Sequence, residues 1–99
     1  MLLNKGIRVF YCTGRSEKYR KITEEWLFKN GIYTHNSSLN MRKRGDERSN
    51  PEVKREMLKE IRENFDVVLA VENNKEVEKM LSQEGILCCI CGDIVEKEI

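Results

Sequence analysis

Four short apolar runs stand out along the chain, each bounded by residues typical of turns. They are rich in Val, Ile, Tyr or Cys and cover residues 7–12, 32–35, 66–71 and 86–91. The first and the last, together with residues 67–71, are apolar at consecutive positions and do not alternate. A strand has this pattern when both of its faces are covered, as in a parallel sheet. The pattern therefore predicts four strands in a largely parallel sheet.

Three segments between these runs have apolar residues at helical spacing. Their predicted caps are Ser16, Asn50 and the pair Asn73 and Asn74. Pro51 falls at the first helical position of the second segment, where its missing N–H costs nothing. Gly31, after Asn30, and Gly85 end the other two segments by supplying a left-handed residue. The faces expected to be buried carry Tyr19, Ile22, Trp26 and Leu27, then Val53, Met57, Leu58 and Ile61, then Val77, Met80 and Leu81.

The order of these elements is strand–helix–strand, a loop, and then helix–strand–helix–strand. Such alternation indicates right-handed crossovers and a layered α/β domain. The length of 99 residues allows one domain, residues 1–99. Residues 36–50 are the exception, because they are polar and show no apolar periodicity. A connection of about fifteen residues is long for a compact domain and is more often functional or mobile than structural.

The amino-acid composition excludes several classes of protein. The hydrophobic fraction of 39% and the charged fraction of 35% predict a small core under a heavily charged surface. The net charge of +1 argues against a protein that mainly coats nucleic acid, although a local basic patch remains compatible with it. No apolar run approaches the roughly 20 residues that span a bilayer, and the first residues lack the apolar stretch of a signal peptide. We therefore expect a cytoplasmic protein with reduced thiols and no membrane contact.

The end of the first predicted strand carries the residues best suited to chemistry. Ligands of an open parallel sheet bind beyond the carboxyl ends of its strands. There, Thr13 offers a hydroxyl, Gly14 allows close approach to the backbone, and Arg15 suits the geometry of a phosphate. Ser16 then opens a helix, whose N-terminal amides favour an anion. These residues fit a phosphate cradle, and they equally fit an ordinary turn before a capped helix.

Two other groups of cations are candidates for binding an anion. Lys54 lies in the first turn of a predicted helix, where a positive charge is unfavourable against the macrodipole. It is either kept for an anion or is a surface lysine paired with a nearby glutamate. The polar segment holds basic residues that would either contact a phosphodiester backbone or remain solvated: Arg42, Lys43, Arg44 and Arg48.

The cysteines and the one histidine favour structure over chemistry. Cys88, Cys89 and Cys91 do not have the spacing of a zinc ribbon, and adjacent strand residues point to opposite faces. With Cys12 they are expected to be structural thiols, although a metal or redox role is the alternative. His35 has no Cys, Ser or acidic partner in evident register, so we expect a solvated or hydrogen-bonded side chain.

Three stretches of the chain resemble consecutive parts of one family: VFYCTGRSEKYRKITEEWL, PEVKREMLKEIRENFDVVLAVENNKEVEKML and EGILCCICGD. The chain is similar to the 3′-phosphatase domain of phage-type polynucleotide kinase/phosphatases, within the haloacid dehalogenase (HAD) superfamily. This resemblance implies an aspartyl-phosphate mechanism built from four motifs. They are an Asp-x-Asp with the nucleophile and the general acid/base, a Thr or Ser that orients the phosphoryl oxygen, a neutralising Lys, and an acidic pair that helps to hold Mg²⁺.

The resemblance places three of these motifs on the chain. Thr13, in CTGR, matches the second motif, and Lys54, in PEVKREML, matches the third. Glu72 and Asn73 stand where the acidic pair is expected, so an amide replaces one carboxylate and Mg²⁺ binding at Glu72 is expected to be weak. The 99 residues contain no Asp-x-Asp. We therefore expect no phosphatase activity from this chain alone, and binding of 3′-phosphate ends or of a protein partner instead.

The family strand that carries Asp-x-Asp lies between those that match residues 7–12 and 66–71. Removing it would leave two unpaired edges, which are costly when buried. The first solution is closure into a truncated, three-layer HAD-like domain, with a four-stranded parallel sheet of order 2-1-3-4 and helices on both faces. The second is a strand supplied by another chain or exchanged within a homodimer, which would complete a split, Mg²⁺-dependent polynucleotide 3′-phosphatase.

Overall fold

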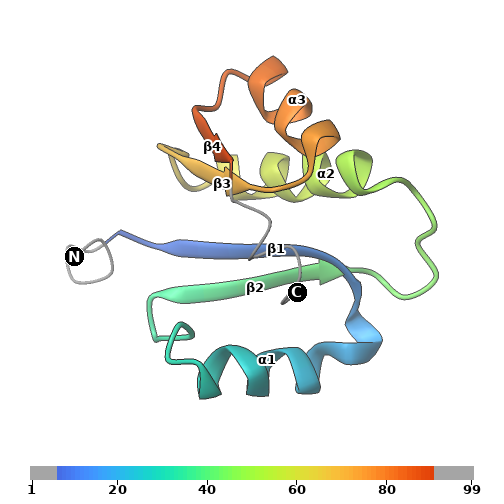
Figure 1. Cartoon of the computed structure of the whole chain (residues 1–99), viewed down its shortest axis with the longest axis vertical. Coiled ribbons are helices and arrows are strands. Elements are labelled where there is room, and N and C mark those ends of the chain that lie inside the picture. Colours follow the sequence, from blue (N-terminus) through green and yellow to red (C-terminus); the bar gives the residue numbers. More distant parts are fainter. Residues whose placement is uncertain (1–6, 91–99) are drawn as a thin grey trace. The chain divides into compact units, whose positions relative to one another are not determined.

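The computed structural model describes residues 7–90 and consists of two compact units, Met1–Glu47 and Arg48–Ile99 (Figure 1). The first unit contains β1 (Val9–Ser16), the 3₁₀ helix η2 (Glu17–Tyr19), α1 (Arg20–Lys29) and β2 (Ser37–Arg42). The second contains α2 (Asn50–Arg62), β3 (Ala70–Glu72), α3 (Lys75–Gln83) and β4 (Cys88–Ile90). Cys91 lies outside the described residues. The chain is thus a small α/β protein with short parallel strands.

The first unit is a two-stranded parallel sheet with α1 on one face (Figure 1). Its register runs from Val9 opposite Ser37 to Thr13 opposite Met41, and then shifts so that Ser16 lies opposite Arg42. The first strand was expected to end at Cys12 and continues to Ser16, so residues 13–15 belong to β1. A bulge places residues 14 and 15 outside the regular ladder near the end of this strand.

The second strand does not lie where the apolar run predicts it. Residues 32–35 form no strand, and β2 occupies part of the segment predicted as a polar loop. The cause is a short alternation that the polar composition conceals: Ser37, Leu39 and Met41 are buried, and the residues between them are partly exposed. Of the predicted loop, residue 36 and residues 43–49 remain outside helices and strands.

The first helix begins later than predicted and buries fewer of its apolar residues. Ser16 caps η2 by accepting a hydrogen bond from the Lys18 amide, and α1 starts only at Arg20. Of the predicted stripe only Leu27 is buried, against Leu39 and Met41. The prediction that Trp26 belongs to the core is wrong, because 44% of its surface is exposed.

The second unit agrees more closely with the sequence pattern. β3 and β4 are parallel, with Ala70 opposite Cys88 and Glu72 opposite Ile90. One helix face each of α2 and α3 supplies most of the core, which consists of Leu58, Val77, Met80, Leu81 and Ile86. The cap of α2 is Ser49 and not Asn50, a shift of one residue that keeps Pro51 in the first turn. Asn74 caps α3 as predicted.

The four strands form two parallel pairs. β1 pairs with β2 and β3 pairs with β4, which are the outer pairs of the predicted order 2-1-3-4. Within residues 7–90 the ladders do not join β1 to β3, so the predicted four-stranded sheet stays a prediction. No helix in the described part of the chain is long and apolar enough to cross a membrane.

Candidate functional site

Two hydrogen bonds hold the bulge near the end of β1. The Thr13 hydroxyl oxygen accepts a hydrogen bond from the Arg15 amide at 3.1 Å. The Gly14 carbonyl accepts another from the Arg42 guanidinium Nε at 2.7 Å. Because the Thr13 oxygen is an acceptor in this bond, its own proton remains able to donate to a phosphoryl oxygen. Whether this hydroxyl serves a phosphate stays a prediction.

The four basic residues of the predicted nucleic-acid contact have different surroundings. Arg42 is only 15% exposed and also donates from Nη1 to the Asp46 carbonyl at 3.1 Å. Arg48 forms an ion pair with Glu56 at 2.7 Å. Lys43 and Arg44 are exposed. Arg42 therefore connects the bulge of β1 to the loop formed by residues 43–49. The exposed cations of this group lie in that loop.

Lys54 and Glu72 form an ion pair of 3.0 Å that is largely withdrawn from solvent, with side chains 16% and 11% exposed. Lys54 comes from the beginning of α2, and Glu72 is the last residue of β3. The second carboxylate oxygen of Glu72 accepts hydrogen bonds from the amides of Asn73 and Asn74, at 3.1 and 3.0 Å. Pairing of Lys54 with a glutamate was one of the two alternatives for this residue, and it is present. The pair lies at the carboxyl end of a parallel strand, which is where ligands bind in open parallel sheets.

The donors around Glu72 do not by themselves fit Mg²⁺. This ion requires several hard oxygen ligands in near-octahedral geometry. Asn73 supplies an amide in place of a carboxylate, and both oxygens of Glu72 already have hydrogen-bond or ion-pair partners. Between residues 7 and 90 there is no group of three His, Cys, Asp or Glu side chains that could hold a metal ion.

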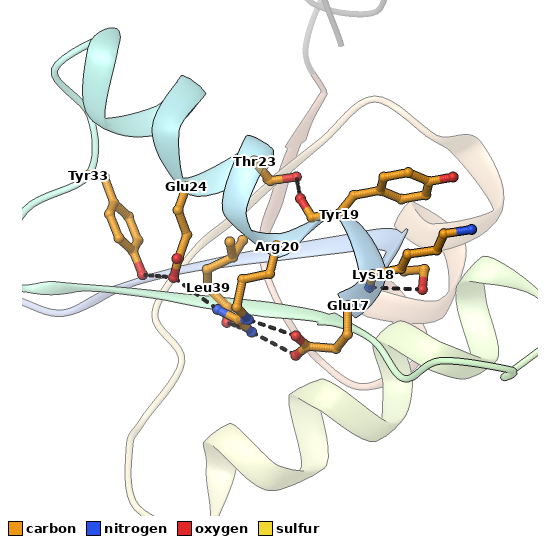
Figure 2. A network of polar contacts seen from close by, with 9 residues as sticks. Glu17, Lys18, Tyr19, Arg20, Thr23, Glu24, Tyr33 and Leu39 are labelled. Carbon is orange, nitrogen blue, oxygen red and sulfur yellow. Dashed lines mark hydrogen bonds and ion pairs between the residues drawn. The ribbon is translucent and has the colours of Figure 1, made fainter.

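A polar network around Arg20, which the sequence pattern did not reveal, lies in the segment that follows β1 (Figure 2). The Arg20 guanidinium donates twice to the Glu17 carboxylate at 2.7 Å, once to Glu24 at 3.2 Å and once to the Leu39 carbonyl at 3.0 Å. These bonds lower the pKa of Glu17 and raise that of Arg20. The i, i+3 and i, i+4 spacing of these three residues could have revealed their pairing, but not the contact with β2.

The predictions for cysteine and histidine are partly met. The Cys12 and Cys88 thiols are half-buried, whereas the Cys89 thiol is exposed. The amide of Asn40 lies 3.8 Å from the Cys12 sulfur. His35 is exposed, in keeping with a solvated side chain.

The two halves of the predicted site thus belong to different units. Thr13, Gly14 and Arg15 belong to the first unit, and the Lys54–Glu72 pair belongs to the second unit. A search of the curated proteins finds no match to the chain. The protein-family model described as "Polynucleotide kinase PNKP phosphatase domain" matches residues 1–93. The match confirms the resemblance expected from the motifs and their order, and the chain belongs to this HAD-type family of polynucleotide kinase phosphatase domains.

Proposed function

We propose that this 99-residue chain binds the 3′-phosphorylated ends of polynucleotides and does not hydrolyse them by itself. The observation that carries this proposal is the Lys54–Glu72 pair, which is mostly buried at the end of β3. A lysine withdrawn from water requires a compensating anion. Glu72 fills that role in this structure, and a phosphate beside Lys54 would share it. Thr13, Gly14 and Arg15 would supply the remaining donors.

The proposal includes one four-stranded sheet of order 2-1-3-4. Two facts support it: the outer pairs of this order are present, and both are parallel. In such a sheet the ends of β1 and β3 would be neighbours, and the switch point would fall between Thr13 and Glu72. A switch point of this kind is where ligands of doubly wound sheets bind.

The lack of turnover follows from the chemistry that the chain contains. Covalent phosphoryl transfer needs an activated nucleophile, and the family supplies it from an Asp-x-Asp that does not occur in these 99 residues. Asn73 also weakens the acidic pair. Binding needs only donors and positive charge, and these are retained.

Titration of a 5′-labelled oligonucleotide at low salt tests the site. We expect tighter binding of the 3′-phosphorylated strand than of the 3′-hydroxyl strand, and a loss of that preference in Lys54→Met. Lys59→Met, an exposed lysine of the same helix, removes the same charge and should keep the preference. Equal binding of both strands by the unmodified chain would refute the 3′-phosphate site. Release of phosphate by the chain alone, with Mg²⁺ present, would refute the non-catalytic part.

A second candidate is one half of a split 3′-phosphatase. It is favoured by the small size of the sheets, because the described residues form two sheets of two strands each, β1 with β2 and β3 with β4. Another polypeptide, or a second copy of this chain, could add a strand there. We propose to test it by co-purifying the chain with fragments that carry an Asp-x-Asp strand. Mg²⁺-dependent phosphate release that requires both parts would support this candidate, and its absence in a stable complex would refute it.

A further inference from the structure

Two cations lie close to an exposed aromatic ring where the end of β1 passes into η2. The Arg15 guanidinium carbon lies 5.7 Å from the centre of the Tyr19 ring, and the Lys18 ammonium nitrogen lies 5.6 Å from it. All three side chains are exposed, Tyr19 by 43%. We call Arg15, Lys18 and Tyr19 the Tyr19 platform.

The charge of the platform is positive because the nearest acidic residue faces another partner. Glu17 lies between Arg15 and Lys18 in the sequence, yet both of its carboxylate oxygens accept hydrogen bonds from Arg20 (Figure 2). In the described part of the chain, Arg15 and Lys18 form no ion pair with a carboxylate. An anion arriving here therefore meets two cations without competition from Glu17.

Hydrogen bonds between side-chain hydroxyls and the backbone order the segment that carries the platform. The Arg15 amide donates to the Thr13 hydroxyl oxygen, and the Lys18 amide donates to the Ser16 hydroxyl oxygen at 3.2 Å. The Tyr19 carbonyl accepts from the Thr23 hydroxyl at 2.8 Å. The aromatic ring is therefore presented by an ordered segment immediately beyond the candidate phosphate donors.

We propose that the Tyr19 platform binds single-stranded polynucleotide, with a base stacked on Tyr19 and backbone phosphates next to Arg15 and Lys18. Stacking platforms flanked by cations are how proteins hold single strands without reading their sequence. The inference rests on the proposed function and deepens it. It assigns the site to a base-bearing strand end and not to a small phosphate monoester.

The test compares oligonucleotides with and without bases near their 3′-phosphate. Loss of one stacked base weakens binding by about tenfold, so Tyr19→Ala should raise the Kd of the base-bearing strand by about that factor. Its Kd for a strand whose last two positions are abasic should stay at the unmodified chain's value. Tyr19→Phe should restore most of the lost affinity. Phe28→Ala removes another exposed aromatic ring of the same unit, 73% exposed, and serves as the control.

Lys18→Ala gives an independent readout. Each phosphate contact on a single strand contributes about 0.7 to the slope of log K against log salt, so this variant should lower the slope by about that amount. Lys29→Ala, at the other end of α1, should not change it.

The outcomes separate this inference from the proposed function. If the 3′-phosphate and 3′-hydroxyl strands bind equally and Tyr19→Ala weakens both, the phosphate site is wrong and the platform stands. The platform is overturned if Tyr19→Ala binds base-bearing strands as tightly as the unmodified chain does, or if its loss is equally large on the abasic strand. Failure of the unmodified chain to bind any oligonucleotide overturns both.

Discussion

Lys54 illustrates how a charge that is costly for its own helix is retained at a site. Lys54 is the fifth residue of α2 and does not lie in its first turn as expected, so the helix macrodipole opposes it only weakly, whereas its low exposure adds a desolvation penalty. The Glu72 carboxylate offsets both costs at 3.0 Å. Glu72 is in turn held by the amides of Asn73 and Asn74. The backbone at the end of β3 therefore positions the pair.

Glu17 leads to a prediction of pH dependence. Its hydrogen bonds with Arg20 lower the pKa of the carboxyl below the ordinary value of 4.5. The stabilisation is therefore complete above that pH and is lost as the pH falls through the lowered pKa of the folded state. Glu17→Gln should reduce the free energy of unfolding at pH 7 by about 0.5–1 kcal/mol, as for partly exposed ion pairs of good geometry. The difference from the unmodified chain should shrink towards zero at the acid end of a series of urea titrations.

Glu25→Gln, an exposed change on α1, is the control. A Glu17→Gln effect that persists undiminished in acid would contradict the assignment.

At the scale of elements, prediction from sequence succeeded where one signal dominated. Each predicted helix was found, because caps and apolar spacing coincide at Asn74 and in the stripe of Val77, Met80 and Leu81. β2 was missed because its buried face holds only Leu39 and Met41 beside Ser37. Residues 32–35 form a longer apolar run and predict a strand that does not occur. The strongest apolar run is thus not always the one that pairs, since pairing depends on the partner strand.

The candidate site shows the same limit. Thr13 and Lys54 could be singled out from their motifs, because strand ends and helix starts are visible in the sequence. The bonds from Arg42 to Gly14 and from Arg20 to Leu39 could not, since they join residues 28 and 19 positions apart. Such contacts depend on which distant segments meet in the folded chain, and local spacing of residues does not reveal that.

The cap of α3 provides a prediction at this scale. The Asn74 side-chain oxygen accepts hydrogen bonds from the amides of Glu76 and Val77, at 2.9 and 3.0 Å. Asn74→Ala leaves both amides without this partner and should lower the free energy of unfolding by about 1 kcal/mol. Asn74→Asp should retain most of the stability because it keeps the acceptor. Urea denaturation followed by circular dichroism measures the change, with Asn73→Ala as the neighbouring control. A cap role would be excluded if Asn73→Ala and Asn74→Ala were equally destabilising.

For the whole molecule, the central question is whether the two units unfold together. Each has its own apolar cluster, one around Leu27, Leu39 and Met41 and the other around Val77 and Met80. Two strands with one covered face are marginal by themselves, and a larger sheet is what usually makes them stable. A single sheet of order 2-1-3-4 would therefore make the two units unfold together. It would also make the two halves of the proposed site part of one sheet.

The single tryptophan offers a direct measurement of this coupling. Trp26 belongs to α1, in the first unit, whereas Met80 is 2% exposed in the core of the second. Met80→Ala should cost about 2–5 kcal/mol through lost packing. If the units share one sheet, Trp26 fluorescence should report that loss as a lower urea midpoint, coincident with the midpoint from circular dichroism. Lys79→Ala, an exposed neighbour, should leave the midpoint in place.

The contrary outcome is that the Trp26 transition of Met80→Ala keeps its midpoint while circular dichroism shows a second and earlier transition. The units would then unfold separately. The four-stranded sheet would then be wrong, and the phosphate site would have to be sought within one unit alone.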